Sequence, residues 1–371
     1  FVFLFSIFYF PFSNFGFADT LGQQVLFNVD PQYEYLSRKQ TSATLKKISE
    51  NAYWYVSDDY WAGILDPERN LFLARLDELA KEFDARIYPI ETAFWGSEQK
   101  PGIDNDLRIT VLIVRLIDQA GGYFDTTHQY RKNQIPESNE RDMVFISTSG
   151  IANERAKIFL AHEFQHLIGF YQKDILQKDI LRGTGEEIWL NEARAEYAPR
   201  LLGYDDVFET SNIRRRMFAF AQNPSDPLAE WKNEASDYGT IALFVNYLAD
   251  HYGDKILVDS LRSGKFSIES LNEALRVNGF SDTFSDIFAN WTVAGILNDA
   301  AANPKFAYKF PHLKDFKISA NQAYIISGIS SFNVSNSVKD WQPIWYEFNT
   351  PVGSGLNLRV DFNGESGSKF A

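Results

Sequence analysis

The spacing of hydrophobic and polar residues divides the chain into segments of different predicted structure. Residues 41–94 are predicted to be mainly helical, because hydrophobic residues from Phe72 to Phe83 recur at helical spacing with mostly polar residues between them. The runs 108–116 and 143–148 are short and rich in β-branched residues, which is typical of strands. We expect these two runs to belong to one sheet, with a long polar loop between them.

Two helices are expected in the middle of the chain. Residues 153–168 are hydrophobic on most sides of a helix and contain no Gly or Pro, which predicts a central, buried helix. A second helix is predicted from Glu186 to about Ala198, with Thr184 as its cap and Pro199 as its stop. Further helices are expected up to about residue 300, including 238–252 and 284–298.

The composition and the residue pattern of the sequence change after Pro304. Ser, Asn and Gly alternate there with aromatic and β-branched residues, which predicts a small antiparallel β domain over residues 304–371. The sequence stops abruptly within this pattern, so we expect the β domain to be incomplete. The main domain is then expected to cover residues 19–303.

The first residues resemble an export signal. Residues 1–12 are almost wholly hydrophobic, and Gly16, Phe17 and Ala18 follow as a small-residue cleavage site. A hydrophobic run of about 12 residues is short for a membrane-spanning helix, which needs roughly 20. We interpret residues 1–18 as the remnant of a signal peptide, with a buried N-terminal strand or a retained anchor as the alternatives. The mature chain is expected to have no membrane span and to be secreted or extracytoplasmic.

The amino-acid composition limits the partners and the metal ligands that the protein can have. The chain has 371 residues, of which 45% are hydrophobic, so it can bury a substantial core. Its formal net charge of -13 repels phosphate backbones, which argues against a nucleic-acid partner. The chain contains no Cys, so His and carboxylates are the only strong ligands left for a transition metal.

The residues His162-Glu163-Phe164-Gln165-His166 match the pattern H-E-x-x-H inside the first predicted central helix. Four residues advance a helix by about 6 Å and a little over one turn, so both imidazoles project from one face and could hold one Zn²⁺ ion. Glu163 could then take a proton from a metal-bound water as general base. The alternative is a core helix whose two histidines only make hydrogen bonds, but it leaves unexplained a carboxylate in the same apolar stretch.

A catalytic zinc needs a third protein ligand, and the next acidic cluster is Trp189-Leu190-Asn191-Glu192-Ala193-Arg194-Ala195-Glu196. W-L-N-E after H-E-x-x-H resembles the gluzincin metallopeptidases, and by this resemblance Glu192 completes the metal site. Glu196 lies one helical turn further on and could accept a hydrogen bond from a ligating histidine. Alternatively, Glu196 is the ligand and Glu192 the outer residue. A third possibility is that this is an exposed helix face on which Arg194 pairs a carboxylate.

Peptide hydrolysis also needs a donor for the developing oxyanion, which gluzincins often supply from a later helix. By this resemblance we predict Tyr238, with His251, His128 and Tyr197 as competitors. The narrower likeness is to the hyicolysin-like bacterial peptidases, through HEFQHLI, W-L-N-E and the preceding Gly-Gly-Tyr-Phe segment. No G-x-M-E-N element is present, and the third metzincin histidine is missing.

The resemblance implies an α+β zincin-like fold with an N-terminal mixed sheet, active-site helices, a helical C-terminal lobe and the small β domain. The expected function is that of a secreted zinc endopeptidase acting on peptides or proteins. Two alternatives remain: a zinc aminopeptidase, and a surface-binding protein that keeps the zinc scaffold without turnover.

Overall fold

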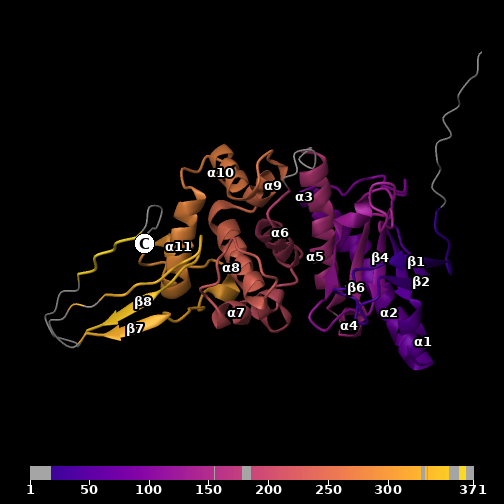
Figure 1. Ribbon diagram of the computed structural model, residues 1–371, viewed down its shortest axis with the longest axis horizontal. Coiled ribbons are helices and arrows are strands. Elements are labelled where there is room, and N and C mark those ends of the chain that lie inside the picture. Colours follow the sequence, from indigo (N-terminus) through magenta and orange to yellow (C-terminus); the bar gives the residue numbers. More distant parts are fainter. Residues whose placement is uncertain are drawn as a thin grey trace, which may run out of the picture. The chain divides into compact units, whose positions relative to one another are not determined.

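A computed structural model describes residues 18–153, 155–177, 185–326, 331, 333–350 and 359–364. The chain forms two compact units, one of residues 1–89 and 97–167 and the other of residues 90–96 and 168–371. The class is α+β, with a mixed sheet and many helices, as predicted (Figure 1). The predicted signal peptide lies outside the described residues except for Ala18, and the predicted helix cap Thr184 lies outside them too.

The first unit contains a six-stranded sheet in the order β1-β2-β3-β4-β6-β5. Its strands are β1 (Gln24–Asn28), β2 (Gln40–Ile48), β3 (Ala52–Ser57), β4 (Ile109–Val114), β5 (Gly122–Tyr123) and β6 (Met143–Ser147). Strands β3, β4 and β6 pair in parallel, whereas β1, β2 and β5 join antiparallel. The two strands predicted from the β-branched runs are confirmed as β4 and β6, and they are direct neighbours.

The central strands are buried along their whole length, as expected for parallel strands covered on both faces. One face carries a cluster that includes Tyr55, Leu112 and Phe145. On the other face Trp54 packs edge-on against Phe83, with ring centroids 5.9 Å apart, and Phe83 packs against Phe164 at 5.1 Å. This aromatic chain ties the helix that carries the H-E-x-x-H pattern to the sheet.

The prediction of helix over residues 41–94 is wrong for residues 41–57, which form most of β2 and all of β3. Side chains along β2 alternate largely between buried and half-buried, and β3 is entirely buried, so tertiary contacts with the sheet decide their structure. Helical structure begins at Asp58. It comprises α1 (Asp58–Gly63), α2 (Asp66–Glu82), a π-helical turn (Phe83–Ile87) and α3 (Tyr88–Trp95).

The predicted central helix is α5 (Ala156–Gly169), which begins three residues later than expected and continues as a π-helical segment over Phe170–Ile175. It follows β6 and the short helix α4 (Thr148–Ala152), and a 3-10 turn over Thr126–Gln129 lies in the long loop before β6. The hydrophobic sequence of α5 agrees with its burial, since every residue from Glu163 to Gly169 is buried.

The second unit is mainly helical. Its larger helices are α6 (Ile188–Leu201), α7 (Asn212–Gln222), α8 (Ala235–Tyr252), α9 (Lys255–Arg262), α10 (Ser267–Val277) and α11 (Phe284–Leu297). The helices predicted near 186–198, 238–252 and 284–298 are confirmed as α6, α8 and α11. Pro199 does not stop α6, because the helix continues to Leu201 and the amide of Leu202 still donates to the carbonyl of Ala198 at 3.1 Å. Short 3-10 turns cover Phe208–Thr210, Pro304–Phe306 and Pro311–Leu313.

After residue 304 the described strands are β7 (Gln322–Ile325) and β8 (Tyr346–Asn349). They pair in parallel rather than antiparallel as predicted, and the number of residues between them is large enough for the crossover that parallel pairing needs. Trp345 donates its indole N–H to the carbonyl of Thr292 in α11 at 2.9 Å.

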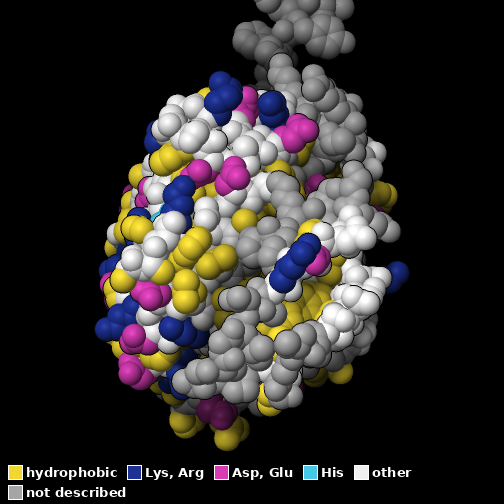
Figure 2. Space-filling model, turned by 90° about the vertical axis from the view of Figure 1, so that its left-hand side faces the viewer, with side chains coloured by type: hydrophobic (Ala, Val, Ile, Leu, Met, Phe, Trp, Pro, Cys, Tyr) yellow, Lys and Arg dark blue, Asp and Glu magenta, His cyan; other side chains and the backbone are white. Residues whose placement is uncertain are grey.

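Hydrophobic side chains lie among charged ones on the face shown in Figure 2. Exposed hydrophobic residues of the C-terminal segment include Ile325 and Val338.

In the part of the chain that the structure describes, no helix combines the length and the hydrophobicity that crossing a membrane requires.

Candidate metal centre

The two histidines of the H-E-x-x-H pattern face each other on α5. Their Nε2 atoms are 3.1 Å apart, and their rings are nearly perpendicular at 79°. Two ligands about 2.0–2.1 Å from a tetrahedral zinc would be separated by roughly 3.3 Å. The helix therefore presents two nitrogen atoms at a spacing that suits one zinc ion.

Glu192 of α6 joins this pair. One ligand atom from each of His162, His166 and Glu192 lies within 4.8 Å of the other two. Two imidazoles and one carboxylate form a donor set that catalytic zinc sites use, with a fourth position left for water. Glu196 is not part of the group. These three residues could therefore hold one metal ion.

Glu163 is buried beside strand β5, with 6% of its surface exposed. A Cβ atom added to Gly122 would lie 2.9 Å from Cγ of Glu163, 3.2 Å from Oε1 and 2.7 Å from the carbonyl oxygen of Phe145. Only glycine therefore fits between this carboxylate and the neighbouring strand. Sequence reasoning missed this role, although the Gly-Gly pair before Tyr123 was its visible signal.

Strand β5 is fixed in place by the residue after this glycine. The ring of Tyr123 stacks on Phe145 with centroids 4.1 Å apart and on Tyr33 at 4.9 Å. Its hydroxyl accepts a hydrogen bond from the amide of Asp30 at 3.1 Å. Gly122 consequently keeps its register opposite Ile146, and the carboxyl group of Glu163 keeps its place.

The carboxylate of Glu196 is held by α7. It accepts hydrogen bonds from Nε of Arg216 at 2.7 Å and from the side-chain amide of Asn212 at 2.8 Å, and a second nitrogen of Arg216 also contacts it. Such a two-pronged arginine pair orients a carboxylate strongly. The predicted bond from Glu196 to a histidine ligand stays a prediction, and Arg216 is a neighbour that sequence reasoning did not identify.

Arg216 also contacts the predicted oxyanion donor. Its guanidinium lies 4.4 Å from the ring centre of Tyr238, whose hydroxyl donates to the side chain of Asn233 at 3.0 Å. Glu196, Arg216 and Tyr238 therefore form a continuous row of contacts. The role of Tyr238 stays a prediction.

The three competitors of Tyr238 have contacts of their own. Nδ1 of His128 accepts the amide of Asn139 at 3.2 Å, and burial lowers the pKa of this imidazole to about 4. Burial also lowers the pKa of His251, whose Nε2 lies 2.9 Å from the carbonyl oxygen of Ala307. Burial raises the pKa of Tyr197 to about 12. His128 and His251 are hence held mainly in their neutral forms at neutral pH.

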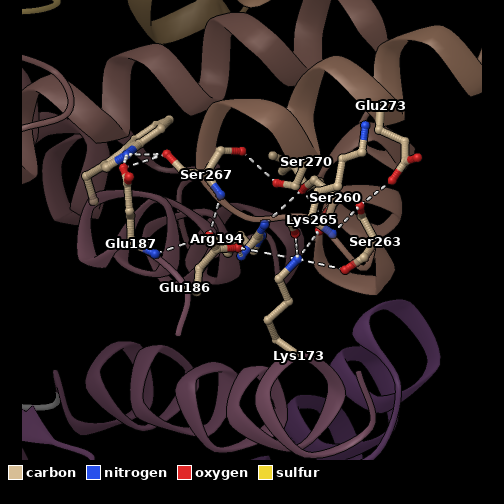
Figure 3. Close-up of polar contacts among 12 residues, drawn as sticks. Lys173, Glu186, Glu187, Arg194, Ser260, Ser263, Lys265, Ser267, Ser270 and Glu273 are labelled. Carbon is tan, nitrogen blue, oxygen red and sulfur yellow. Dashed lines mark hydrogen bonds and ion pairs between the residues drawn. The ribbon is translucent and has the colours of Figure 1, made fainter. Parts of the chain in front are cut away.

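A buried ionic network holds the start of α6 (Figure 3). Arg194 is fully buried and donates to Glu186 at 2.7 Å, so it does not lie on an exposed helix face paired with Glu196. Lys173 points at the carbonyl oxygens of Ser260 and Ser263, at 3.0 and 2.9 Å, and also contacts that of Lys265. Burial opposes the charge on Glu186, but Arg194 and Lys173 together lower its pKa.

Further contacts of Lys173 and Arg194 extend this buried network. Lys173 lies 3.8 Å from Glu186, and Arg194 also donates to the hydroxyl of Ser260 at 3.0 Å. Arg194 is two residues from Glu192 along α6. The network therefore fixes the helix that carries the candidate carboxylate ligand.

No protein family model matches this sequence, and no curated protein is significantly similar to it.

Proposed function

We propose that this protein is a secreted zinc-dependent endopeptidase with a zincin-like fold of the gluzincin type. The observation that carries the proposal is the grouping of His162, His166 and Glu192, with Glu163 buried in the turn between the two histidines. The α+β class and the helical position of the H-E-x-x-H pattern support it.

Each residue of the proposed site would carry out one part of peptide hydrolysis. Zinc held by the two imidazoles and Glu192 would polarise the scissile carbonyl and lower the pKa of a bound water. Glu163 takes the proton from the attacking water and passes it to the leaving amine. The close approach of Glu163 to Gly122 sets its carboxyl group against strand β5, and a proton transfer of this kind requires a positioned carboxyl group.

Strand β5 supports an extended peptide as substrate. It ends the order of described strands, runs antiparallel to β6 and lies directly against Glu163. A peptide that adds to this edge would be held by main-chain hydrogen bonds, which are independent of side-chain identity. Binding of that kind suits an endopeptidase, and Tyr238 is our proposal for the group that stabilises the oxyanion.

Two experiments test the proposal. In the first, the zinc content of the purified protein and of the Glu163→Gln variant is measured together with hydrolysis of a peptide library. We expect one zinc ion per chain in both proteins and a loss of at least about 10²-fold in hydrolysis by the variant. Hydrolysis that survives this substitution unchanged removes Glu163 from the mechanism.

The second experiment compares Glu192→Gln with Glu196→Gln, which are matched in chemistry and lie one turn apart on α6. We expect Glu192→Gln to lose most of its zinc and Glu196→Gln to retain it, which decides between the two carboxylates. Substrates with free and blocked amino termini then separate the alternatives. Preference for a free terminus indicates an aminopeptidase, and retained zinc with no hydrolysis of any peptide indicates a binding protein on a zincin scaffold.

A further inference from the structure

The loop before α8 holds Tyr238, the residue proposed to stabilise the oxyanion. Residues 223–234 join α7 to α8, and the structure describes all of them without a helix or a strand. The ring of Trp231 packs edge-on against Tyr238 with ring centroids 4.8 Å apart, and the hydroxyl of Tyr238 donates to the side-chain oxygen of Asn233 at 3.0 Å. The position of this hydroxyl therefore depends on the conformation of the loop.

Polar contacts join the two ends of this loop. Oδ2 of Asp237, in the first turn of α8, accepts the amides of Lys232 at 3.0 Å and Glu234 at 2.7 Å. Nζ of Lys232 lies 3.1 Å from Oε2 of Glu230 and 3.6 Å from Oδ1 of Asp226, which is 1% exposed. The buried start of the loop is thus linked through Lys232 to the first turn of α8.

A second segment, residues 339–342, holds the same loop. Three residue pairs join the two segments: Trp341 with Leu228, Gln342 with Ser225, and Lys339 with Glu230. The amide of Leu228 donates to the carbonyl oxygen of Trp341 at 3.0 Å. The side-chain amide of Gln342 donates to the carbonyl oxygen of Ser225 at 2.9 Å. The loop is therefore fixed at three points by residues far from it in the sequence.

The conformation of Trp341 is set by its packing against α11. Its φ angle of 54° lies in the left-handed region, which a residue other than glycine keeps only where its surroundings enforce it. Its ring packs edge-on against Phe284, with ring centroids 4.6 Å apart, and against Phe288 at 5.3 Å. These contacts hold the backbone so that its carbonyl oxygen accepts the amide of Leu228.

We propose that Trp341 is a positioning residue for Tyr238 and acts through the loop 223–234. The inference rests on the proposed function, in which Tyr238 stabilises the oxyanion. Trp341 anchors the loop to α11, and the loop in turn holds the ring and the hydroxyl of Tyr238. Because a catalytic group that moves by about 1 Å loses on the order of 10²-fold in rate, an anchor outside the site can control the rate of hydrolysis.

Hydrogen exchange of the purified protein tests the anchoring without any need for activity. Trp341→Ala is compared with the wild type and with Trp61→Ala, a control that removes an indole packed edge-on against Phe72 in the first unit. We expect the amides of residues 225–234 to exchange at least about tenfold faster in Trp341→Ala and at the wild-type rate in Trp61→Ala, because only the first variant loses the anchor. Gln342→Ala removes a different contact of the same segment, and it serves if Trp341→Ala does not fold.

Peptide hydrolysis tests the consequence for Tyr238. We expect Trp341→Ala to lower kcat by about tenfold, with KM and zinc content close to those of the wild type, and Tyr238→Phe to lower kcat by about 10²-fold. In the double variant, Trp341→Ala should have little further effect, because no hydroxyl is left to position.

The outcomes separate this inference from the proposed function. A wild type that hydrolyses no peptide refutes the proposed function and the effect on kcat with it, while the exchange rates still decide whether Trp341 anchors the loop. The inference is overturned if residues 225–234 exchange at the wild-type rate in folded Trp341→Ala and Gln342→Ala. It is equally overturned if Trp341→Ala leaves kcat unchanged, or lowers it as much in the Tyr238→Phe background as in the wild type.

Discussion

Gly122→Ala is the substitution that most directly tests how the fold positions Glu163. The added methyl group would lie 2.7 Å from the carbonyl oxygen of Phe145 and 2.9 Å from Cγ of Glu163. Ordinary contacts of carbon atoms are about 3.5–4.0 Å, so neighbours must separate by roughly 1 Å. The oxygen belongs to the backbone of β6, so β5 and β6 must separate slightly at this point, and the side chain of Glu163 must move as well.

The expected costs follow from these contacts. Overpacking of this size destabilises a protein by about 1–3 kcal/mol, which leaves a protein of ordinary stability folded. A catalytic group displaced by about 1 Å loses on the order of 10²-fold in rate. His162 and His166 do not touch the added methyl group as nearest neighbours, so zinc content should be unchanged.

The assay measures kcat, KM and zinc content for Gly122→Ala alongside Gly63→Ala. The control adds the same methyl group at the end of α1, where no atom of the described part of the chain lies within 4 Å of it. We expect kcat to fall about 10²-fold in the first variant with zinc retained, and the second variant to match the wild type. Full activity in a folded, zinc-loaded Gly122→Ala protein would refute the positioning of Glu163 by this strand.

Two further predictions concern stability. Lys173→Met should lower the free energy of unfolding by about 3–5 kcal/mol in urea titrations, because it leaves three carbonyl oxygens without their buried cation and leaves Glu186 with Arg194 alone. The same change at the exposed Lys255 should cost less than about 1 kcal/mol. Equal losses in the two variants would contradict this reasoning. Glu91 is fully buried, neither of its carboxylate oxygens has a hydrogen-bond partner among the described residues, and burial raises its pKa well above the usual value. The unfolded chain releases this proton above about pH 4.5 and the folded chain retains it, so stability should fall as pH rises from there. The stability gained on Glu91→Gln should therefore be larger at pH 8 than at pH 4, and a gain independent of pH would show that Glu91 ionises normally.

The local sequence pattern is sufficient to predict those helices and strands whose hydrophobic residues have a clear helical or strand pattern. Strands β4 and β6 and helices α5, α8 and α11 were predictable because short β-branched runs or long uninterrupted hydrophobic segments leave little choice. Strands β2 and β3 were mistaken for helix because the helical periodicity of α2 was extended backwards over residues that only the sheet buries. The parallel pairing of β7 and β8 was likewise invisible, since strand composition does not encode direction.

The sequence by itself determined the spacing of His162, Glu163 and His166, since four residues on a helix always place two side chains on one face. It also determined that only His and carboxylates are left as strong ligands for a transition metal in a chain without Cys. Only tertiary structure groups Glu192, and not Glu196, with the two histidines, because both carboxylates lie on one helical face and local sequence does not distinguish them. Packing also decided that Gly122 makes room for Glu163 and that Arg216 holds Glu196, since both contacts join residues far apart in the chain whose meeting no local periodicity records.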